Sequence, residues 1–151
     1  MDTLKEYYDW IHCLSRALVS ALVKEAGHNF IYDNELTEGA EKHSEAMMIR
    51  GETYDAPKDL WKPAISELVD KRVASYPHPG EKDLVIQKTI EEMAEDFFHL
   101  GYHSFLRCLS AVMGVGIAVR ENPGQVIIYA TIRVTTARLK GVKIDSEESM
   151  V

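Results

Sequence analysis

The feature that most constrains this chain is a long apolar stripe near its start. Between residues 4 and 26, apolar side chains recur every three or four positions, the spacing that places them on one face of an α-helix. Thr3 and Glu6 form a capping-box pattern before this stretch, and Gly27 follows it as a natural stop. The sequence therefore predicts a first helix whose stripe is buried against another helix, inside the chain or across a dimer.

A second helix is predicted over residues 35–50. Asp33 or Asn34 is placed to act as its N-cap, and Gly51 follows its last residue. Its apolar face is thin and includes His43, which is therefore expected to be a buried, hydrogen-bonded histidine.

Two more helices are predicted downstream. Apolar residues spaced as in a helix run through residues 58–75, although Pro63 moves the start of that helix towards residue 62. A fourth helix begins after Asp83, and its apolar stripe continues as far as Cys108. The pair of glycines in Gly114-Val115-Gly116 then breaks the pattern and indicates either close helix packing or a hinge.

The last segment has two interpretations. Asn122-Pro123-Gly124-Gln125 resembles a helix start and Lys140-Gly141 a helix end, yet residues 126–135 have the composition of a strand. Because both end signals agree, the helix is favoured. The predicted fold is a single all-α domain over residues 1–144, a compact bundle of four to five helices, with a disordered acidic tail at 145–151. The alternative is an α+β fold with a C-terminal hairpin around 116–135.

Charge and hydropathy narrow the class of protein. The net charge of −7 disfavours a protein that coats nucleic acid, which should be basic. The longest uncharged apolar stretch, residues 108–119, is shorter than the ~20 residues that a membrane span needs. Cys13 and Cys108 show no metal spacing and are expected to be buried, reduced thiols, so the expected location is cytoplasmic.

A basic cluster near the C-terminus is the place where a nucleic acid would be contacted. The charge is uneven: residues 33–59 hold eight acidic and three basic residues, whereas residues 120–143 hold five basic residues and one acidic residue. A nucleic-acid role is not favoured over an ordinary charged surface, and it would use Arg133, Arg138, Lys140 and Lys143.

The run from Glu91 to His103 suggests metal chemistry. Glu95, His99 and His103 follow one another at intervals of four residues, so a helix would place them on the same face. Carboxylate and imidazole groups are ligands of zinc and iron. The same face points away from the apolar stripe and supplies at most three of the four ligands of a closed zinc site. A solvated helix face is therefore the favoured interpretation of these residues, with the metal site as the alternative.

Two pairs of carboxylates suggest a magnesium site. Glu38 and Glu41 share an E-x-x-E spacing with Glu92 and Glu95, and on facing helices such pairs would bind Mg²⁺ together with a substrate phosphate. The two four-residue motifs, 38–41 and 92–95, resemble those of the all-α nucleoside-triphosphate pyrophosphohydrolases of the MazG kind. In this chain Glu95 stands where Asp is usual, and a whole helix separates the two motifs. The resemblance implies a helical hydrolase of nucleotide phosphates.

Three functions therefore remain as hypotheses. The first is a small, non-catalytic interaction or assembly protein that acts as a homo-oligomer or as a subunit of a larger complex. This hypothesis rests on the absence of a complete catalytic motif and on the long apolar stripe of the first helix. The second is the Mg²⁺-dependent hydrolase, and the third is a zinc or iron site on the fourth helix. The sequence identifies neither a partner nor a substrate.

Overall fold

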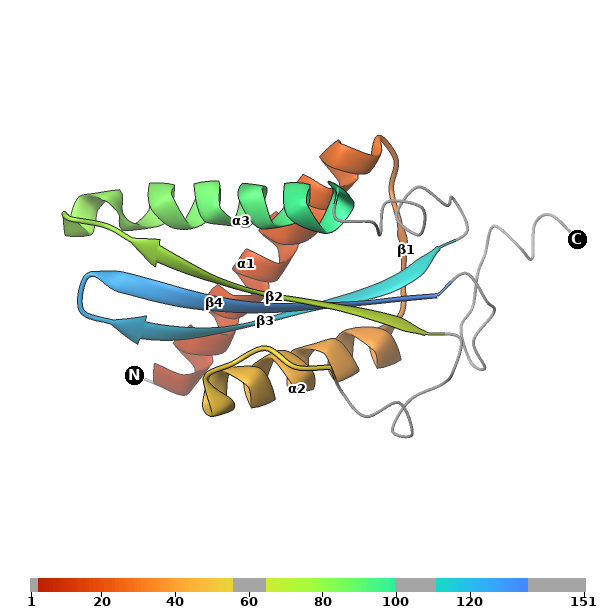
Figure 1. The fold of residues 1–151 in the computed structure, drawn as a ribbon, viewed down its shortest axis with the longest axis horizontal. Helices are drawn as coiled ribbons and strands as arrows, with labels where there is room; N and C mark the ends of the chain where they lie inside the picture. Colours follow the sequence, from red (N-terminus) through yellow and green to blue (C-terminus); the bar gives the residue numbers. More distant parts are fainter. Residues whose placement is uncertain (1–2, 56–64, 100–110, 136–151) are drawn as a thin grey trace, which may run out of the picture.

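The computed structural model describes residues 3–55, 65–99 and 111–135 and has an α+β fold (Figure 1). In the described residues, three helices pack on a four-stranded mixed sheet, so the predicted all-α bundle is wrong. In chain order the elements are α1 (Thr3–Ala26), β1 (Ile31–Tyr32), α2 (Asn34–Arg50), β2 (Ser66–Ser75), the short 3-10 turn η2 (Pro79–Glu81), α3 (Lys82–His99), β3 (Val112–Asn122) and β4 (Gln125–Thr135).

The two helices predicted first are confirmed, as are the stop of the first at Gly27 and both end signals of the second. The side chain of Asp33 accepts a hydrogen bond from the backbone nitrogen of Leu36 at 2.8 Å, which makes it the N-cap of α2. Gly51 ends α2 with a positive φ of 85°, a conformation that glycine adopts without strain. His43 on α2 is 6% exposed, as the sequence predicted.

Two segments predicted to be helical are strands. The segment 66–75 pairs with β4 over its whole length, from Ser66 opposite Val134 to Ser75 opposite Gln125. The favoured C-terminal helix is likewise replaced by a strand, β4. The predicted fourth helix is confirmed as α3 as far as His99, and residues 100–110, where its apolar stripe was expected to continue, lie outside the described residues. A short apolar run fits the spacing of a helix as well as that of a strand. In this chain, which of the two forms depends on strand partners far away in the sequence.

The hairpin that the sequence offered as an alternative is present. Asn122 pairs with Gln125, and Pro123-Gly124 forms the two-residue connection between β3 and β4. Gly124 has a φ of 74°, which the turn requires. The Asn-Pro-Gly-Gln signal therefore marks a turn rather than a helix start, and the β-branched residues that follow it form a strand. Lys140-Gly141, the expected helix end, lies outside the described residues.

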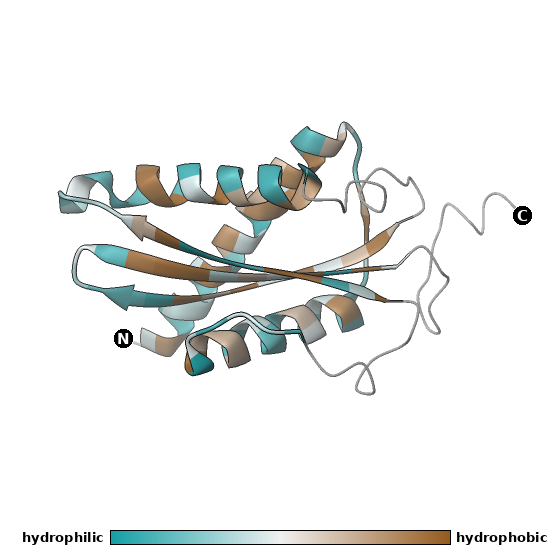
Figure 2. Cartoon of the chain, viewed as in Figure 1, coloured by the Kyte–Doolittle hydropathy of each residue, from teal (hydrophilic) through white to brown (hydrophobic). Residues whose placement is uncertain are grey.

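The elements form layers around the sheet, whose strand order is β1-β3-β4-β2. α2 covers one face and α3 the other, while α1 runs diagonally past the β1/β3 edge and packs against α3 (Figure 1). Figure 2 shows apolar residues along the strands and apolar residues interspersed with polar ones on the helices. The main core lies between the sheet, α1 and α3, and it includes Leu18, Ile90 and Ile132, each fully buried. A helix long and apolar enough to cross a membrane is absent from the described residues.

The face of the sheet under α2 is built differently from the core face. Gly114 and Gly116 of β3 point towards α2, and a Cβ atom at either position would overlap the backbone of the helix. The predicted role of these glycines in close packing is therefore confirmed, with a strand in place of the expected helix. The expected burial of Cys13 is wrong, because Cys13 lies exposed on the polar side of α1; Cys108 lies outside the described residues.

Candidate functional site

The structure does not bring together the carboxylate pairs that suggested a magnesium site. Glu38 and Glu41 belong to α2, Glu92 and Glu95 belong to α3, and the sheet lies between these two helices (Figure 1). Glu38 forms an ion pair with Lys42 at 3.5 Å, whereas Glu41 forms one with His12 of α1 at 3.3 Å.

The histidine face of α3 is also dispersed. Glu92, Glu95 and His99 are exposed, and His99 lies 3.8 Å from Glu25 of α1. His103 lies outside the described residues. Within ranges 3–55, 65–99 and 111–135, no group of three or more His, Cys, Asp or Glu side chains is arranged to hold a metal ion. The expectation of metal binding is therefore corrected for this part of the chain: the face carries solvated residues and one ion pair to a neighbouring helix.

A buried polar cluster lies instead between α2 and the sheet, and we define it as His43, Glu67 and Arg133. The Glu67 side chain on β2 is only 2% exposed. One of its oxygens accepts a hydrogen bond from Nε of Arg133 on β4 at 2.8 Å, and the other lies 3.4 Å from Nε2 of His43. Glu67 and Arg133 face each other directly in the β2–β4 register, so the sheet itself holds the ion pair together.

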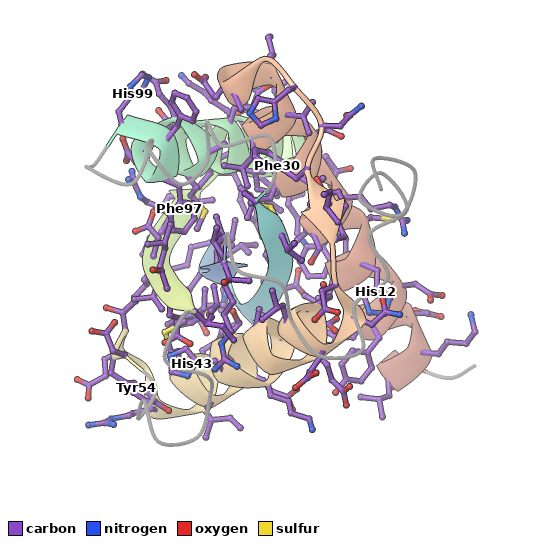
Figure 3. All side chains as sticks on the ribbon, turned by 90° about the vertical axis from the view of Figure 1, so that its right-hand side faces the viewer. His12, Phe30, His43, Tyr54, Phe97 and His99 are labelled. Atoms are coloured by element: carbon purple, nitrogen blue, oxygen red, sulfur yellow. The ribbon has the colours of Figure 1, made fainter. Side chains whose placement is uncertain are left out.

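The contacts of His43 determine where its proton lies. Nε2 is 2.6 Å from the carbonyl oxygen of Tyr54 and 3.4 Å from the Glu67 carboxylate, and both of these groups only accept hydrogen bonds. Nε2 therefore carries a proton and donates it. The Tyr54 ring stands edge-on to the imidazole at 4.9 Å, and the Arg50 guanidinium lies 4.4 Å from the Tyr54 ring centre (Figure 3).

The cluster fixes α2 on the sheet and leaves little reactive surface. The guanidinium of Arg133 lies against Gly39, where a Cβ atom would overlap it. Next to the cluster, the hydroxyl of Ser44 donates to the carbonyl of Gly116 at 2.8 Å and lies 2.8 Å from the hydroxyl of Thr131, which can donate to it in turn. Arg133 is thus committed to Glu67 and α2 and is not available to a nucleic acid; Arg138, Lys140 and Lys143 lie outside the described residues.

The sequence interpretation missed Glu67 and Arg133 as partners. It placed both residues in predicted helices, where nothing relates positions 67 and 133. The available signal was Gly39: a glycine in the middle of a helix costs ~1 kcal/mol relative to alanine, which suggests that another group approaches the helix closely there.

A groove between α1 and α2 is the second candidate site. Its volume is about 480 Å³, within the range of sites that hold ligands. Its walls are mainly apolar, and the His12–Glu41 ion pair links α1 to α2 beside it. His12 lies on the opposite side of α2 from His43, so the groove and the polar cluster are separate (Figure 3). The lining residues are His12, Ser15, Arg16, Val19, Ser20, Tyr32, Thr37, Glu41 and Val115.

The floor of the groove is the outer edge of β3. β1 pairs with this edge only at Val112 and Met113, and the backbone nitrogen of Asp33 donates to the Met113 carbonyl at 3.0 Å. After Asp33 the chain turns into α2, so β1 cannot continue along β3. Six residues beyond Met113, the Tyr7 hydroxyl contacts both the nitrogen and the carbonyl oxygen of Val119, each at 3.1 Å.

The Tyr32 phenol, which lines this groove, has a raised pKa. Burial raises the pKa of Tyr32 to about 12, because the ionised phenolate would lose hydration there. Tyr32 is therefore neutral at physiological pH and offers a ring and a hydroxyl rather than a charge.

Comparison with known proteins adds no function to these observations. No protein-family model matches the chain, and no curated protein matches it at a significant level.

Proposed function

We propose that this chain is a small, non-catalytic interaction protein that binds its partner in the α1–α2 groove. The observation that carries this proposal is the groove itself, a mainly apolar cavity of about 480 Å³ next to an incompletely paired strand. Apolar grooves with a few polar groups on their rim are the usual form of a binding site, since the walls supply affinity and the polar groups supply orientation.

The polar cluster supports a structural role rather than catalysis. A catalytic acid or base must reach the substrate, but Glu67 is 2% exposed and His43 donates its Nε2 proton to groups inside the protein. The cluster instead holds α2 at a fixed distance from the sheet. One wall of the groove is therefore rigid, which reduces the entropy lost when a partner binds.

The acidic balance of the chain fits a protein partner. The net charge of −7 repels nucleic acid. Of the four basic residues predicted to contact nucleic acid, Arg133 lies among the described residues, and it is paired with Glu67. The groove rim carries both signs of charge, with Arg16 from α1 and Glu41 from α2. Mixed charge of this kind orients a protein partner without attracting a polyanion.

A large side chain placed in the groove tests this proposal. Ser20 is exposed and lines the groove, so Ser20→Trp places an indole in it; Gln87→Trp adds the same group to an exposed position on α3. Immobilised wild-type protein and both variants are incubated with an extract of the source cells, and bound proteins are quantified by mass spectrometry. We expect a partner that Ser20→Trp loses and Gln87→Trp retains. Identical retention by all three proteins would contradict the proposal, as would the absence of any specific partner.

Self-association is tested with the same variants. Sedimentation equilibrium of the wild type and of Ser20→Trp shows whether the partner is a second copy of the chain, because a homo-oligomer formed through the groove dissociates when the groove is filled.

A further inference from the structure

We propose that the groove binds an extended peptide segment of the partner, which pairs with the open edge of β3 as an added strand. This inference rests on the proposed binding function and specifies the chemistry of the ligand. It starts from the backbone of β3, where hydrogen-bonding groups of two residues have no partner among the described residues.

The direction of those groups follows from the contacts at the two ends of the edge. Met113 and Val119 both use backbone groups on the side away from β4, in contact with Asp33 and Tyr7 respectively. The register between β3 and β4 runs without interruption from Val112 to Asn122, so every second residue points its N–H and C=O the same way. Val115, which lines the groove, and Ile117, two residues further along β3, therefore direct their backbone groups away from β4.

The residues that carry these groups are largely buried, and none of the described residues supplies a partner for them. Val115 lines the groove and is only 3% exposed, and Ile117 is 3% exposed as well. Backbone groups buried in such a place need a hydrogen-bonding partner, since an unsatisfied one costs ~1–3 kcal/mol. An extended backbone offers donors and acceptors at the required spacing, about 7 Å between alternate residues of a strand. A rigid small molecule does not reproduce that repeat.

The two ends of the edge limit the length of the segment. Tyr7 closes one end by occupying Val119, and β1 closes the other at Met113. The open stretch thus pairs with a short segment whose side chains alternate between α1 and α2. On the α1 side they meet Val19 and the hydroxyl of Ser15, which is buried and has no hydrogen-bond partner in the described part of the chain.

Charge supplies a second requirement for the partner. Arg16 lines the groove and is exposed; its guanidinium reaches the sulfur of Cys13 at 3.3 Å, and it forms no ion pair with a described residue. A segment with alternating apolar side chains and one acidic side chain near Arg16 complements both the walls and this charge.

The probe is the pentapeptide Thr-Val-Asp-Val-Thr, with fluorescein on its N-terminus and an amidated C-terminus. A second peptide of the same sequence has alternate peptide nitrogens methylated, so that it cannot donate hydrogen bonds to a strand edge. Binding to the full-length protein is measured by fluorescence polarisation. We expect the wild type to bind the first peptide at least about tenfold more tightly than the methylated one, the effect of losing hydrogen bonds at a buried edge.

Two proline variants locate the binding on the protein. Val115→Pro removes the outward N–H of β3, whereas Val73→Pro removes an N–H of the same orientation from β2, the opposite edge strand. On β2 the outward direction is marked by Lys71, whose backbone nitrogen donates to the side chain of Asp70 at 2.8 Å. Edge strands tolerate proline where the N–H points away from the sheet. We expect Val115→Pro to weaken binding about tenfold and Val73→Pro to leave it within twofold.

Arg16→Gln tests the charge requirement. The variant should bind the probe more weakly than the wild type, and its affinity should depend less on salt concentration, because one charge pair is lost.

The outcomes separate this inference from the proposed function. Equal binding of the two peptides by the wild type overturns the inference even where Val115→Pro fails to fold, and so does the absence of any binding. If Ser20→Trp loses the cellular partner while Val115→Pro keeps it, the groove binds its partner without strand pairing, and only the inference fails. If neither variant loses the partner, the proposed function fails as well.

Discussion

Glu67 is the residue on which the seating of α2 on the sheet depends most. Its carboxylate is almost fully buried and is compensated by Arg133 on the adjacent strand and by His43 on the helix. A buried ion pair adds little stability compared with an apolar pair of the same volume, but removing one partner leaves an uncompensated charge. The cluster therefore determines the position of α2 on the sheet, and its three residues depend on one another.

Arg133→Met tests this coupling. The variant leaves Glu67 buried without its cation, and we expect the free energy of unfolding to fall by about 3–5 kcal/mol. The matched control is Arg72→Met, which breaks partly exposed ion pairs with Asp70 and Asp96 and should cost about 1 kcal/mol or less. Urea denaturation of both variants gives the two numbers. Similar losses in the two variants would show that the Glu67–Arg133 pair is no more coupled than a surface pair.

The double variant Glu67→Leu/Arg133→Met adds a second check on the same pair. If the cost of Arg133→Met comes from the stranded charge, the double variant recovers most of the lost stability, because no ionised group stays buried. A double variant that is less stable than Arg133→Met would point to packing as the source of the loss.

Tyr32 makes stability depend on pH at the alkaline end. Its pKa is about 12 in the folded protein, above the ordinary value of 10, because burial disfavours the phenolate. The stabilisation is fully present below pH 10 and is lost as the pH rises towards 12, since only the unfolded chain ionises in that interval. Urea denaturation at pH 9 and at pH 11 should show that the wild type loses more stability than Tyr32→Phe. Equal losses would contradict the raised pKa.

At the scale of elements, the two glycines of β3 set the distance between α2 and the sheet. A side chain at Gly116 would occupy the space of the α2 backbone at Ala40 and Glu41, and backbone of this kind cannot move aside cheaply. The same contact brings Ser44 close enough to donate to the Gly116 carbonyl. The close approach of α2 to β3 and the buried hydrogen bond from Ser44 to Gly116 therefore depend on one another.

Gly116→Ala should consequently be far more disruptive than a single methyl group suggests. We expect a loss of about 3 kcal/mol, because α2 must move away from the sheet and loses its contacts with Ser44 and the cluster. Gly80→Ala is the control, since Gly80 has open space where a Cβ atom would stand. Thermal unfolding followed by circular dichroism compares the two. An unfolding temperature for Gly116→Ala close to that of Gly80→Ala would contradict the close packing.

Local signals in the sequence predict the helices better than the strands. The caps of α2 at Asp33 and Gly51 and the stripe of α1 involve neighbours within a few residues, and both helices form as expected. β2 and β4 depend on partners about sixty residues apart, and such pairing leaves no local mark. The polar cluster was missed for the same reason, because it exists only once β2, β4 and α2 have been brought together.

At the scale of the whole molecule, the two edges of the sheet are protected to different degrees. On the β2 edge, the Asp70 side chain accepts from the Lys71 backbone nitrogen, and charged residues follow one another along the strand, features that discourage pairing with another chain. On the β3 edge, β1 and Tyr7 cover the ends and leave Val115 and Ile117 between them. In the part of the chain that the structure describes, the sheet therefore has one edge that resists an added strand and one that offers a short place for it.

Hydrogen exchange at the amides of Val115 and Ile117, followed by nuclear magnetic resonance, tests this account most directly. In the free protein these two amides should exchange faster than those of Gly114 and Gly116, which point towards β4. With the Thr-Val-Asp-Val-Thr peptide at saturation, their exchange should slow by at least about tenfold, while the amide of Val73 on β2 stays unchanged. Unchanged exchange at Val115 and Ile117 in the presence of the peptide, or full protection already in the free protein, would contradict the claim that this edge receives a partner strand.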